Sequence, residues 1–589
     1  MKISIYIILT LIFITLFSCT KDFLEEPPSL DLDEDKVFSN TEQTLALIAT
    51  TYQISIPQGY PLINNNNDGV YYSFRRLTGS VLAAACDEGD AVETWSEVQA
   101  WNTGTVLPTN IDWKEDNFHQ MRWRAVRNCN IILERVDEVP DASAEFKNQA
   151  KGESYFLRAL CHFEAFKRYG GIPLIKTKLS SSDDLYIPRS TVEETVNFIL
   201  EDCAEALKLL PATQPANWKG RADKGCVLAL KARLLLYAAS PLFNTATPYM
   251  SFDDASNNTL ICYGNYDQNR WKLAADASKA VLDWAAANGC SLLTGYGVDH
   301  NYEMLTVLNQ HSEIILANQA KTNFNGTAGT WDLNERMMSI LTGKWSGSTY
   351  SDGGVNVPMN FIRYYEKKDG TPQTWNNSGD DLMDKYSELD PRFNQSIGHH
   401  GGKWSDGVGV LSMFQGSQHV VNGHGHWMRK LIMWDMANTS QKRYVTWIVF
   451  RLGEFYLNYA EALNEFNGTP PSEAYTAVKA IRERSGMPAF PSGLTKEQFR
   501  EKLRNERAIE LAFEEHRFWD IRRWLIAKDE GVMSGAFYGI KVSDAGNSKV
   551  HYEKYVFENR TWYDKMYLHP FLQSEVNKYA GKLPQNPGW

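Results

Sequence analysis

Three glutamates near the end of the chain have a spacing that suits acid–base chemistry. Glu506, Glu510 and Glu514 recur at every fourth position, so a helix would place their carboxylates on one face. Two carboxylates on one surface are what glycoside hydrolysis requires. These residues therefore define the catalytic hypothesis against which other interpretations are compared.

Arginines interleave with these acidic residues and favour a different interpretation. Glu514 lies three residues before Arg517, and Asp520 lies three residues before Arg523. Opposite charges at this helical spacing are neighbours and form ion pairs. We interpret the stretch as ion-pair architecture and expect the protein not to be an enzyme, with a glycoside hydrolase as the less favoured alternative.

Four histidines raise the question of a metal site. His399 and His400 are adjacent, and His424 and His426 follow in a glycine-rich stretch with no acidic residue at a regular offset. Zinc sites need ligands held at defined spacing, so we predict a solvated loop here and no metal. The sequence also shows no CxxC pair, phosphate-binding loop or Gly-x-Ser-x-Gly elbow, so we expect no cofactor.

Binding chemistry has more support, in two irregular stretches that mix aromatic and polar residues. The first runs from residue 75 to residue 102 and includes Asp87 and Asp90, and the second runs from residue 331 to residue 356. A sugar offers apolar C–H faces and a rim of hydroxyl groups, so a sugar site pairs flat rings with Asn, Asp or Arg side chains. Both stretches fit this composition.

The elements that would position these residues are mostly helical. Apolar periodicity and capping signals predict helices over residues 113–136, 144–169, 191–210, 222–239, 268–287, 445–464, 471–484 and 495–526. Thr191 and Glu194 have capping-box spacing. Residues 291–442 are rich in Gly, Asn, Ser, Trp and Tyr and show little periodicity, which indicates long functional loops. Helix pairs of this size suggest tetratricopeptide-like stacking.

The first residues have the pattern of an export signal. An apolar run follows Lys2 and ends in Ser18-Cys19, which resembles the site where bacteria acylate a cysteine and cleave before it. We predict a signal peptide over 1–18 and a lipidated Cys19 with a tether over 19–34, the alternative being an ordinary signal peptide. Two or three acyl chains would hold the protein on a membrane, and no later segment approaches the roughly 20 apolar residues of a spanning helix.

Charge and cysteine count restrict the remaining possibilities. The net charge of −11, with no basic face, argues against a nucleic-acid partner. Without Cys19, seven of the eight cysteines remain, so they cannot all pair within one chain. Cys161, Cys203 and Cys226 fall in predicted helices, where a free cysteine acts as a small buried apolar residue.

Several motifs, taken in order, carry a family resemblance. They are Glu153-Ser154-Tyr155-Phe156-Leu157-Arg158-Ala159, Tyr169-Gly170-Gly171-Ile172-Pro173-Leu174, Gly220-Arg221-Ala222-Asp223-Lys224, Ser312-Glu313-Ile314-Ile315, Arg451-Leu452-Gly453-Glu454, Arg504-Asn505-Glu506-Arg507, Arg517-Phe518-Trp519-Asp520-Ile521-Arg522-Arg523-Trp524 and the terminal Gln585-Asn586-Pro587-Gly588-Trp589. Together they resemble the SusD/RagB family of Bacteroidetes outer-membrane nutrient-binding lipoproteins. The resemblance covers nearly everything after Cys19.

The resemblance implies a mostly α fold, a right-handed superhelix of tetratricopeptide-like helix pairs with long irregular loops that form a ligand-binding face. It implies one SusD-like fold over 35–589, with an N-terminal part at 35–290 and a C-terminal part at 291–589. It further implies a surface-exposed, lipid-anchored protein of the outer membrane that delivers glycans to a SusC-like TonB-dependent barrel. A peptide-binding member of the same family is the alternative.

The same resemblance suggests which residues contact the ligand. In glycan-binding members the N-terminal and mid-chain loops supply the aromatic and polar partners. By that comparison we expect binding by residues of the two stretches described above, namely Trp101, Asn102, Trp331, Trp95, Arg75 and Tyr350. For each of them, a core or loop-anchoring role is the competing interpretation.

Overall fold

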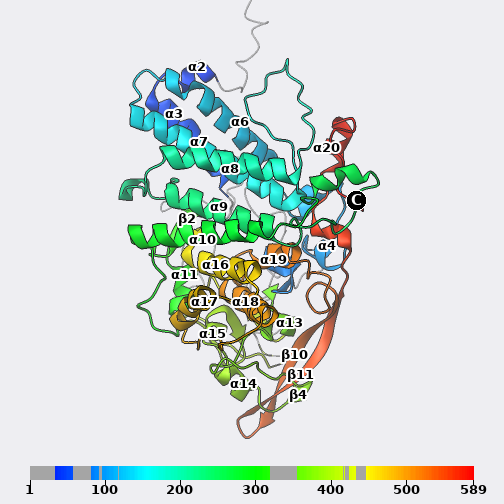
Figure 1. The fold of residues 1–589 in the computed structure, drawn as a ribbon. Coiled ribbons are helices and arrows are strands. Elements are labelled where there is room, and N and C mark those ends of the chain that lie inside the picture. The colour runs from blue at the N-terminus through cyan, green and yellow to red at the C-terminus, as the bar shows by residue number, and fades with distance from the viewer. Residues whose placement is uncertain are drawn as a thin grey trace, which may run out of the picture.

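The computed structural model describes residues 33–56, 81–91, 96–116, 119–318, 355–414, 417, 424–432 and 446–589. Its long helices are α3 (Thr41–Ser55), α6 (His119–Arg135), α7 (Ala144–Tyr169), α8 (Val192–Leu209), α9 (Lys224–Ala239), α10 (Asn269–Asn288), α16 (Leu452–Phe466), α17 (Ser472–Arg484) and α18 (Lys496–Glu510). From α3 to α17 each of these helices packs against the next, and α18 packs against α16 (Figure 1). This stack of neighbouring helices confirms the mostly helical prediction.

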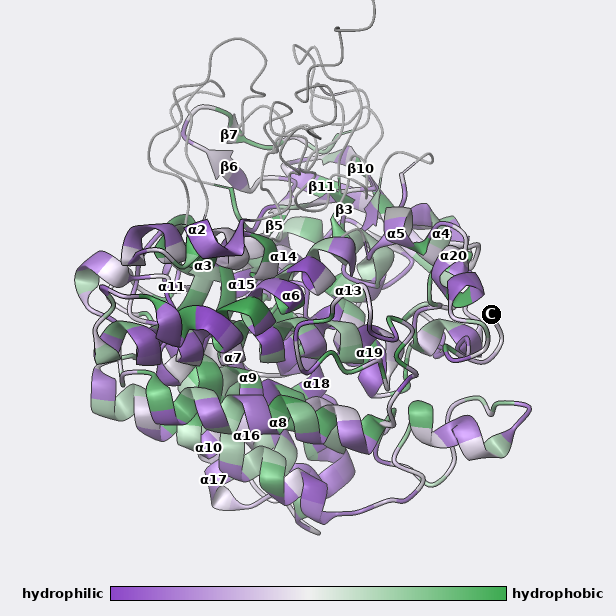
Figure 2. Cartoon of the chain, turned by 90° about the horizontal axis from the view of Figure 1, so that it is seen from above, coloured by the Kyte–Doolittle hydropathy of each residue, from purple (hydrophilic) through white to green (hydrophobic). Residues whose placement is uncertain are grey.

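Shorter helical segments connect the stack to the rest of the molecule. They are α2 (Glu34–Val37), α4 (Gln99–Asn102), α5 (Ile111–Lys114), α11 (Asn301–Val307), α13 (Met359–Ile362), α14 (Leu382–Glu388), α15 (Arg392–Ser396), α19 (Arg517–Arg523) and α20 (Gln573–Lys578). Hydrophobic and hydrophilic residues alternate along the ribbons of the long helices (Figure 2). This is the pattern of amphipathic helices that pack one face inward.

The capping chemistry read from the sequence explains several helix ends. The Thr191 side chain accepts from the Glu194 backbone N–H while the Glu194 carboxylate accepts from that of Thr191, so the predicted capping box is present at α8. Helix α7 has the predicted bounds and ends at Gly170, whose φ of 78° favours glycine. At Gly225 a Cβ atom would overlap the Trp284 indole, so glycine there allows the close approach of α9 and α10.

Three predicted helices are wrong in part. Residues 113–136 are not one helix, since α5 ends at Lys114 and α6 begins at His119. Residues 445–464 do not begin as helix, because β9 (Trp447–Arg451) precedes α16 and pairs with β2 (Ile314–Asn318). Its Trp-Ile-Val-Phe run has the composition of a strand. Residues 495–526 are not one helix either, since α18 ends at Glu510 and α19 begins at Arg517. Phe513 and Glu515 in the turn between them have φ of 60° and 66°.

The strands form small antiparallel sheets. One sheet has the order β1 (Asp90–Ala91), β3 (Val355–Asn356), β8 (His426–Met428) and β5 (Ile397–His399). The long hairpin of β10 (Gly535–Gly546) and β11 (Lys549–Arg560), together with β4 (Ser378–Gly379), lies at the end of the molecule opposite α2 (Figure 1). Strands β6 (Lys403–Ser405) and β7 (Gly409–Val410) form a further pair. The described part of residues 291–442 is thus built from short elements, which its lack of periodicity concealed.

The terminal motif is tied to the end of α7. The Asn586 side chain donates to the carbonyls of Tyr169 and His569, at 3.1 and 2.7 Å, and Gln585 hydrogen-bonds both backbone groups of Phe571. The Trp589 indole donates to Lys565 O at 2.9 Å. These side chains therefore join the last residues to the Gly-Gly turn that ends α7.

The cysteines behave as predicted from the helical pattern. Cys161, Cys203 and Cys226 are buried, and the cysteines of the described residues are unpaired thiols. Among the described residues, no helix is both long enough and apolar enough to span a membrane. Cys19 lies outside the described residues.

Candidate ligand-binding site

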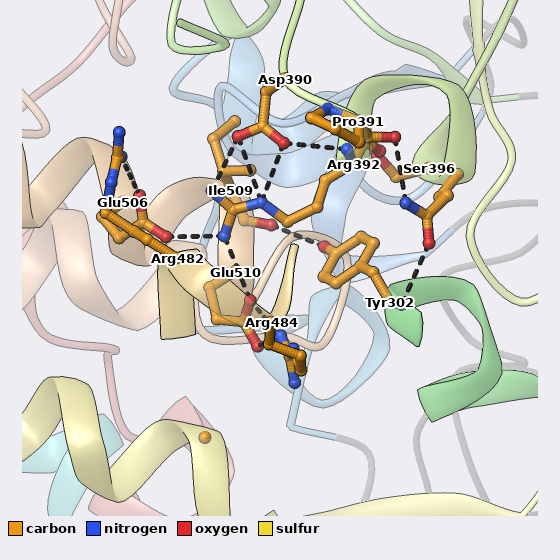
Figure 3. A network of polar contacts seen from close by, with 12 residues as sticks. Tyr302, Asp390, Pro391, Arg392, Ser396, Arg482, Arg484, Glu506, Ile509 and Glu510 are labelled. Carbon is orange, nitrogen blue, oxygen red and sulfur yellow. Dashed lines mark hydrogen bonds and ion pairs between the residues drawn. The ribbon is translucent and has the colours of Figure 1, made fainter. Parts of the chain in front are cut away.

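Two of the three glutamates that raised the catalytic hypothesis, Glu506 and Glu510, are buried in a network of ion pairs (Figure 3), and Glu514 is half-buried beside them. Glu510 accepts hydrogen bonds from Arg484 at 2.5 Å, Arg451 at 2.7 Å and Arg392 at 3.2 Å. Burial alone would raise the pKa of Glu510, but these guanidinium groups outweigh it and hold the pKa below its ordinary value. The carboxylate is thus fixed in its charged form as a structural centre.

The neighbouring glutamates are paired in the same way. Glu506 accepts from Arg392 and Arg482, each at 2.6 Å. Glu514 accepts from Arg451 at 2.6 Å and from Lys430 at 2.6 Å. The prediction of ion-pair architecture is confirmed, and the network joins α18 to β9, α15 and α17.

The partners differ from those that the local spacing suggested. Asp520 and Arg523 do pair, at 2.7 Å, as predicted. Arg517 instead makes a two-pronged contact with Asp87, at 2.8 and 2.7 Å, because the turn after α18 separates it from Glu514. Long-range pairing has therefore replaced a predicted helical neighbour.

Asp87 and Asp90, which the sequence placed in an acidic and aromatic binding stretch, are buried beside the first strand of the sheet. Asp90 Oδ1 accepts from Gln99 and Asn102, each at 3.2 Å. Next to Asp87, Glu88 Oε1 accepts from the backbone N–H of Phe513 at 3.0 Å. Burial raises the pKa of Glu88 to about 8. These acids attach β1 to the helices rather than facing a ligand.

Trp101 and Asn102 lie on α4 and are fully buried. The Trp101 ring packs edge-on against Phe518, with centroids 5.2 Å apart, and lies 4.8 Å from His569. Asn102 Nδ2 donates to Ala84 O at 3.1 Å. These contacts favour the core interpretation for both residues, because neither exposes a surface on which a sugar could stack.

The other predicted ligand residues, Arg75, Trp95, Trp331 and Tyr350, lie outside the described residues. Some of the described residues that flank their segments lie in paired strands. Ala91 pairs with Val355, Asn356 with Trp427, and Asn318 with Trp447. Ala91, the last described residue before Trp95, and Val355, the first described residue after Tyr350, are therefore paired neighbours in one sheet.

The histidines of the sheet were predicted to lie in a solvated loop, and that prediction is wrong. His399 and His426 are buried, and His424 is largely shielded. Tyr386 Oη lies 2.7 Å from His426 Nε2, and the His424 ring stacks on Phe557 at 4.0 Å between centroids. Aromatic neighbours distant in sequence bury these rings, so the glycines around them were a poor guide. Among the described residues, no group of three or more His, Cys, Asp or Glu side chains is placed to hold a metal ion.

Burial of these histidines predicts a pH dependence of stability. It lowers the pKa of His399 to about 4 and that of His426 to about 3, against about 6.5 in an unfolded chain. Below pH 6.5 these histidines bind protons in the unfolded state but stay neutral in the folded state. Acidification towards pH 4 therefore lowers the free energy of unfolding. Each histidine contributes roughly 1.4 kcal/mol per pH unit in this window.

Urea unfolding of wild type and His426→Gln at pH 7.5, 6.5 and 5.5 measures this effect. The variant should lose less stability than wild type on acidification, because one of the buried titrating groups is gone. The slope of the free energy of unfolding against pH is compared between the two proteins. This comparison cancels the contribution of Glu88, whose raised pKa increases stability on acidification in both. Equal slopes for the two proteins would show that His426 does not resist protonation.

Two models of known protein families match this chain. A family model described as "SusD family" matches residues 312–589, and one described as "Starch-binding associating with outer membrane" matches residues 22–236. The chain belongs to the SusD/RagB family. Its members are non-catalytic binding proteins, in keeping with the ion-paired glutamates.

Individual relatives have low sequence identity to this chain but match most of its length. This SusD-like chain is 25% identical to SusD-like protein P38 of Formosa agariphila over 432 residues, covering 69% of this chain and 71% of that protein. SusD-like protein P25 of the same organism is 22% identical, with 90% and 91% covered. The family resemblance read from the motifs is confirmed.

Solved structures support the SusD-like fold. A SusD-like protein from Bacteroides fragilis matches with a TM-score of 0.75 at 25% identity, covering 96% of this chain and 100% of that one. A SusD-like carbohydrate binding protein from the same organism has a TM-score of 0.69 at 21% identity, with 93% and 99% covered. A laminarin binding SusD-like protein has a TM-score of 0.58 at 20% identity, with 94% and 100% covered. The predicted fold class is therefore confirmed.

Proposed function

We propose that this SusD-like protein captures oligo- or polysaccharides at the surface of the outer membrane and delivers them to a SusC-like TonB-dependent barrel. The observation that carries the proposal is the match of two SusD-type family models to residues 22–236 and 312–589, together with the likeness to solved structures described as carbohydrate or laminarin binding. One of the two family models is itself described as associating with the outer membrane.

The proposed attachment is a lipid on Cys19 after removal of residues 1–18, with residues 19–34 as a tether. The sequence of the leader supports it. We propose one SusD-like fold over 35–589, whose parts at 35–290 and 291–589 are both represented in the helix stack. Contacts between α10 of the first part and α16 of the second support treating them as one fold.

We place the glycan site at the loops attached to the β1–β3–β8–β5 sheet. Trp331, Tyr350, Trp95 and Arg75 are its proposed ligand residues, because their types suit sugar stacking and hydrogen bonding. The flanking residues of the Trp95 and Tyr350 segments pair across this sheet. Trp101 and Asn102 would then support the loop from below rather than contact the sugar.

Affinity electrophoresis tests the ligand class. The soluble protein without residues 1–19 is run in native gels that contain plant, host or microbial polysaccharides, with a non-binding protein as the mobility standard. Retardation by at least one polysaccharide is the expected result. If none retards the protein and short oligosaccharides also fail in calorimetry, while peptides bind, the glycan proposal is contradicted and the peptide-binding alternative replaces it.

A further inference from the structure

A cavity in the helix stack lies among elements other than those of the glycan site. Its volume is about 220 Å³. Helices α10, α16 and α18 form most of its wall, and Pro241, which follows α9, and Trp524, which follows α19, complete it. The lining residues are Pro241, Trp271, Glu461, Glu465, Arg500, Leu503, Arg504 and Trp524. Apolar side chains thus share the cavity with two arginines and two glutamates.

Both glutamates of the cavity are already engaged. Glu465 receives a two-pronged contact from Arg500, at 2.5 and 2.6 Å. Glu461 receives a similar contact from Arg523, at 2.5 and 2.7 Å, and its Oε1 also accepts from the Trp524 indole at 2.7 Å. The negative charge that lines the cavity is therefore committed to other cations.

Arg504 is the arginine of the cavity that neither of these glutamates pairs with. Its guanidinium carbon lies 4.8 Å from the centroid of the Trp524 ring, and its Nε is buried without a hydrogen-bond partner. Within the described residues the Arg504 side chain makes no hydrogen bond or ion pair. Burial, together with Arg500 and Arg523, lowers its pKa to about 10 against the opposing attraction of Glu461 and Glu465, so the group remains charged at neutral pH. A half-buried charge without a partner costs stability and is a ready anion site.

We propose that this cavity binds the carboxylate of a small organic acid whose body is a ring with an apolar face. The forked donors of Arg504 match the two oxygens of a carboxylate. Trp271, Leu503 and Pro241 offer an apolar wall for the ring. Glu461 and Glu465 disfavour anions with more than one charge, so a carboxylate suits the cavity better than a phosphate.

Such an acid could be a uronic acid released from a glycan or an aromatic acid, and the test separates these sources. Isothermal titration calorimetry of the protein without residues 1–19 is carried out with benzoate and with glucuronate. Benzyl alcohol and glucose serve as uncharged analogues. The expected result is binding of at least one acid and at least tenfold weaker binding of its uncharged analogue. Binding of benzoate alone assigns the site to aromatic acids, and binding of glucuronate alone assigns it to uronic acids.

Variants locate the binding. Arg504→Gln should weaken it at least tenfold, and Arg504→Lys should restore only part of it, because lysine keeps the charge but loses the fork. Arg124→Gln, at an exposed arginine of α6, is the charge-matched control and should bind like wild type. Melting curves check that each variant is folded.

Two results would overturn the proposal: neither acid binds wild type, or a folded Arg504→Gln binds as tightly as wild type. Retention by polysaccharide in gels reports separately on the glycan site, and Arg504→Gln should leave it unchanged. Trp331→Ala, in turn, should leave binding of the acid unchanged. Failure of this proposal is therefore distinguishable from failure of the proposed function.

Discussion

Replacing Glu510 with alanine is expected to lower the free energy of unfolding by about 3–5 kcal/mol. The side chain is fully buried and holds Arg392, Arg451 and Arg484, so its loss leaves three buried guanidinium groups without their shared anion. The free energy of unfolding from urea titrations measures the effect. It should be among the largest of any single substitution, because the network joins α18 to three other elements.

Glu501 provides the matched control on the same helix. It is exposed on α18, and Glu501→Ala should change stability by no more than about 0.5 kcal/mol. If Glu510→Ala and Glu501→Ala proved equally stable, the network would not be the joint between helices that we describe. Replacing the whole network with apolar residues is a different experiment, since buried ion pairs can be exchanged for packing at little cost.

Trp101→Ala is expected to lower the free energy of unfolding by about 3–5 kcal/mol, the usual cost of removing a large buried ring. The ring fills space between Phe518 and His569 and also faces Arg522, whose guanidinium carbon lies 5.0 Å from its centroid. Arg522 donates to Phe518 O, but its Nε and Nη2 have no hydrogen-bond partner, so aromatic faces are its main stabilising neighbours. Urea unfolding measures the loss.

Trp218, which is 38% exposed, supplies the comparison. Trp218→Ala should cost about 0.5 kcal/mol or less. If Trp101→Ala were as stable as Trp218→Ala but no longer retained by polysaccharide, Trp101 would be a ligand-binding residue and not a core residue. Loss of stability with retention preserved at low temperature would support its core role.

The long helices could be predicted because local signals determine them. Helix α7 has the predicted bounds, and α8 begins at the predicted capping box. The break between α18 and α19 could not be predicted, since it depends on Phe513 donating to Glu88, a residue far away in the sequence. The apolar residues Leu511, Phe518 and Ile521 keep helical spacing across this turn, so the sequence pattern gives no sign of the break.

The candidate site was less accessible to sequence reasoning. Family resemblance pointed to aromatic residues in irregular stretches, but composition alone does not distinguish a ring that faces solvent from one that fills the core. Trp101 is of the second kind, because Phe518 of α19 and His569 near the chain end pack against it and leave it fully buried. The histidines of β5 and β8 were misjudged for the same reason. The pairing of Ala91 with Val355, by contrast, had no sequence signal.

Calorimetry of Trp331→Ala with the glycan that retards wild type tests the central claim most directly, with Trp218→Ala as the exposed-tryptophan control. We predict at least tenfold weaker binding for Trp331→Ala, about 1.4 kcal/mol or more, with an unchanged melting temperature. Trp218→Ala should bind like wild type. Wild-type affinity in Trp331→Ala, and likewise in Tyr350→Ala and Trp95→Ala, would contradict a glycan site at the loops joined to the β1–β3–β8–β5 sheet.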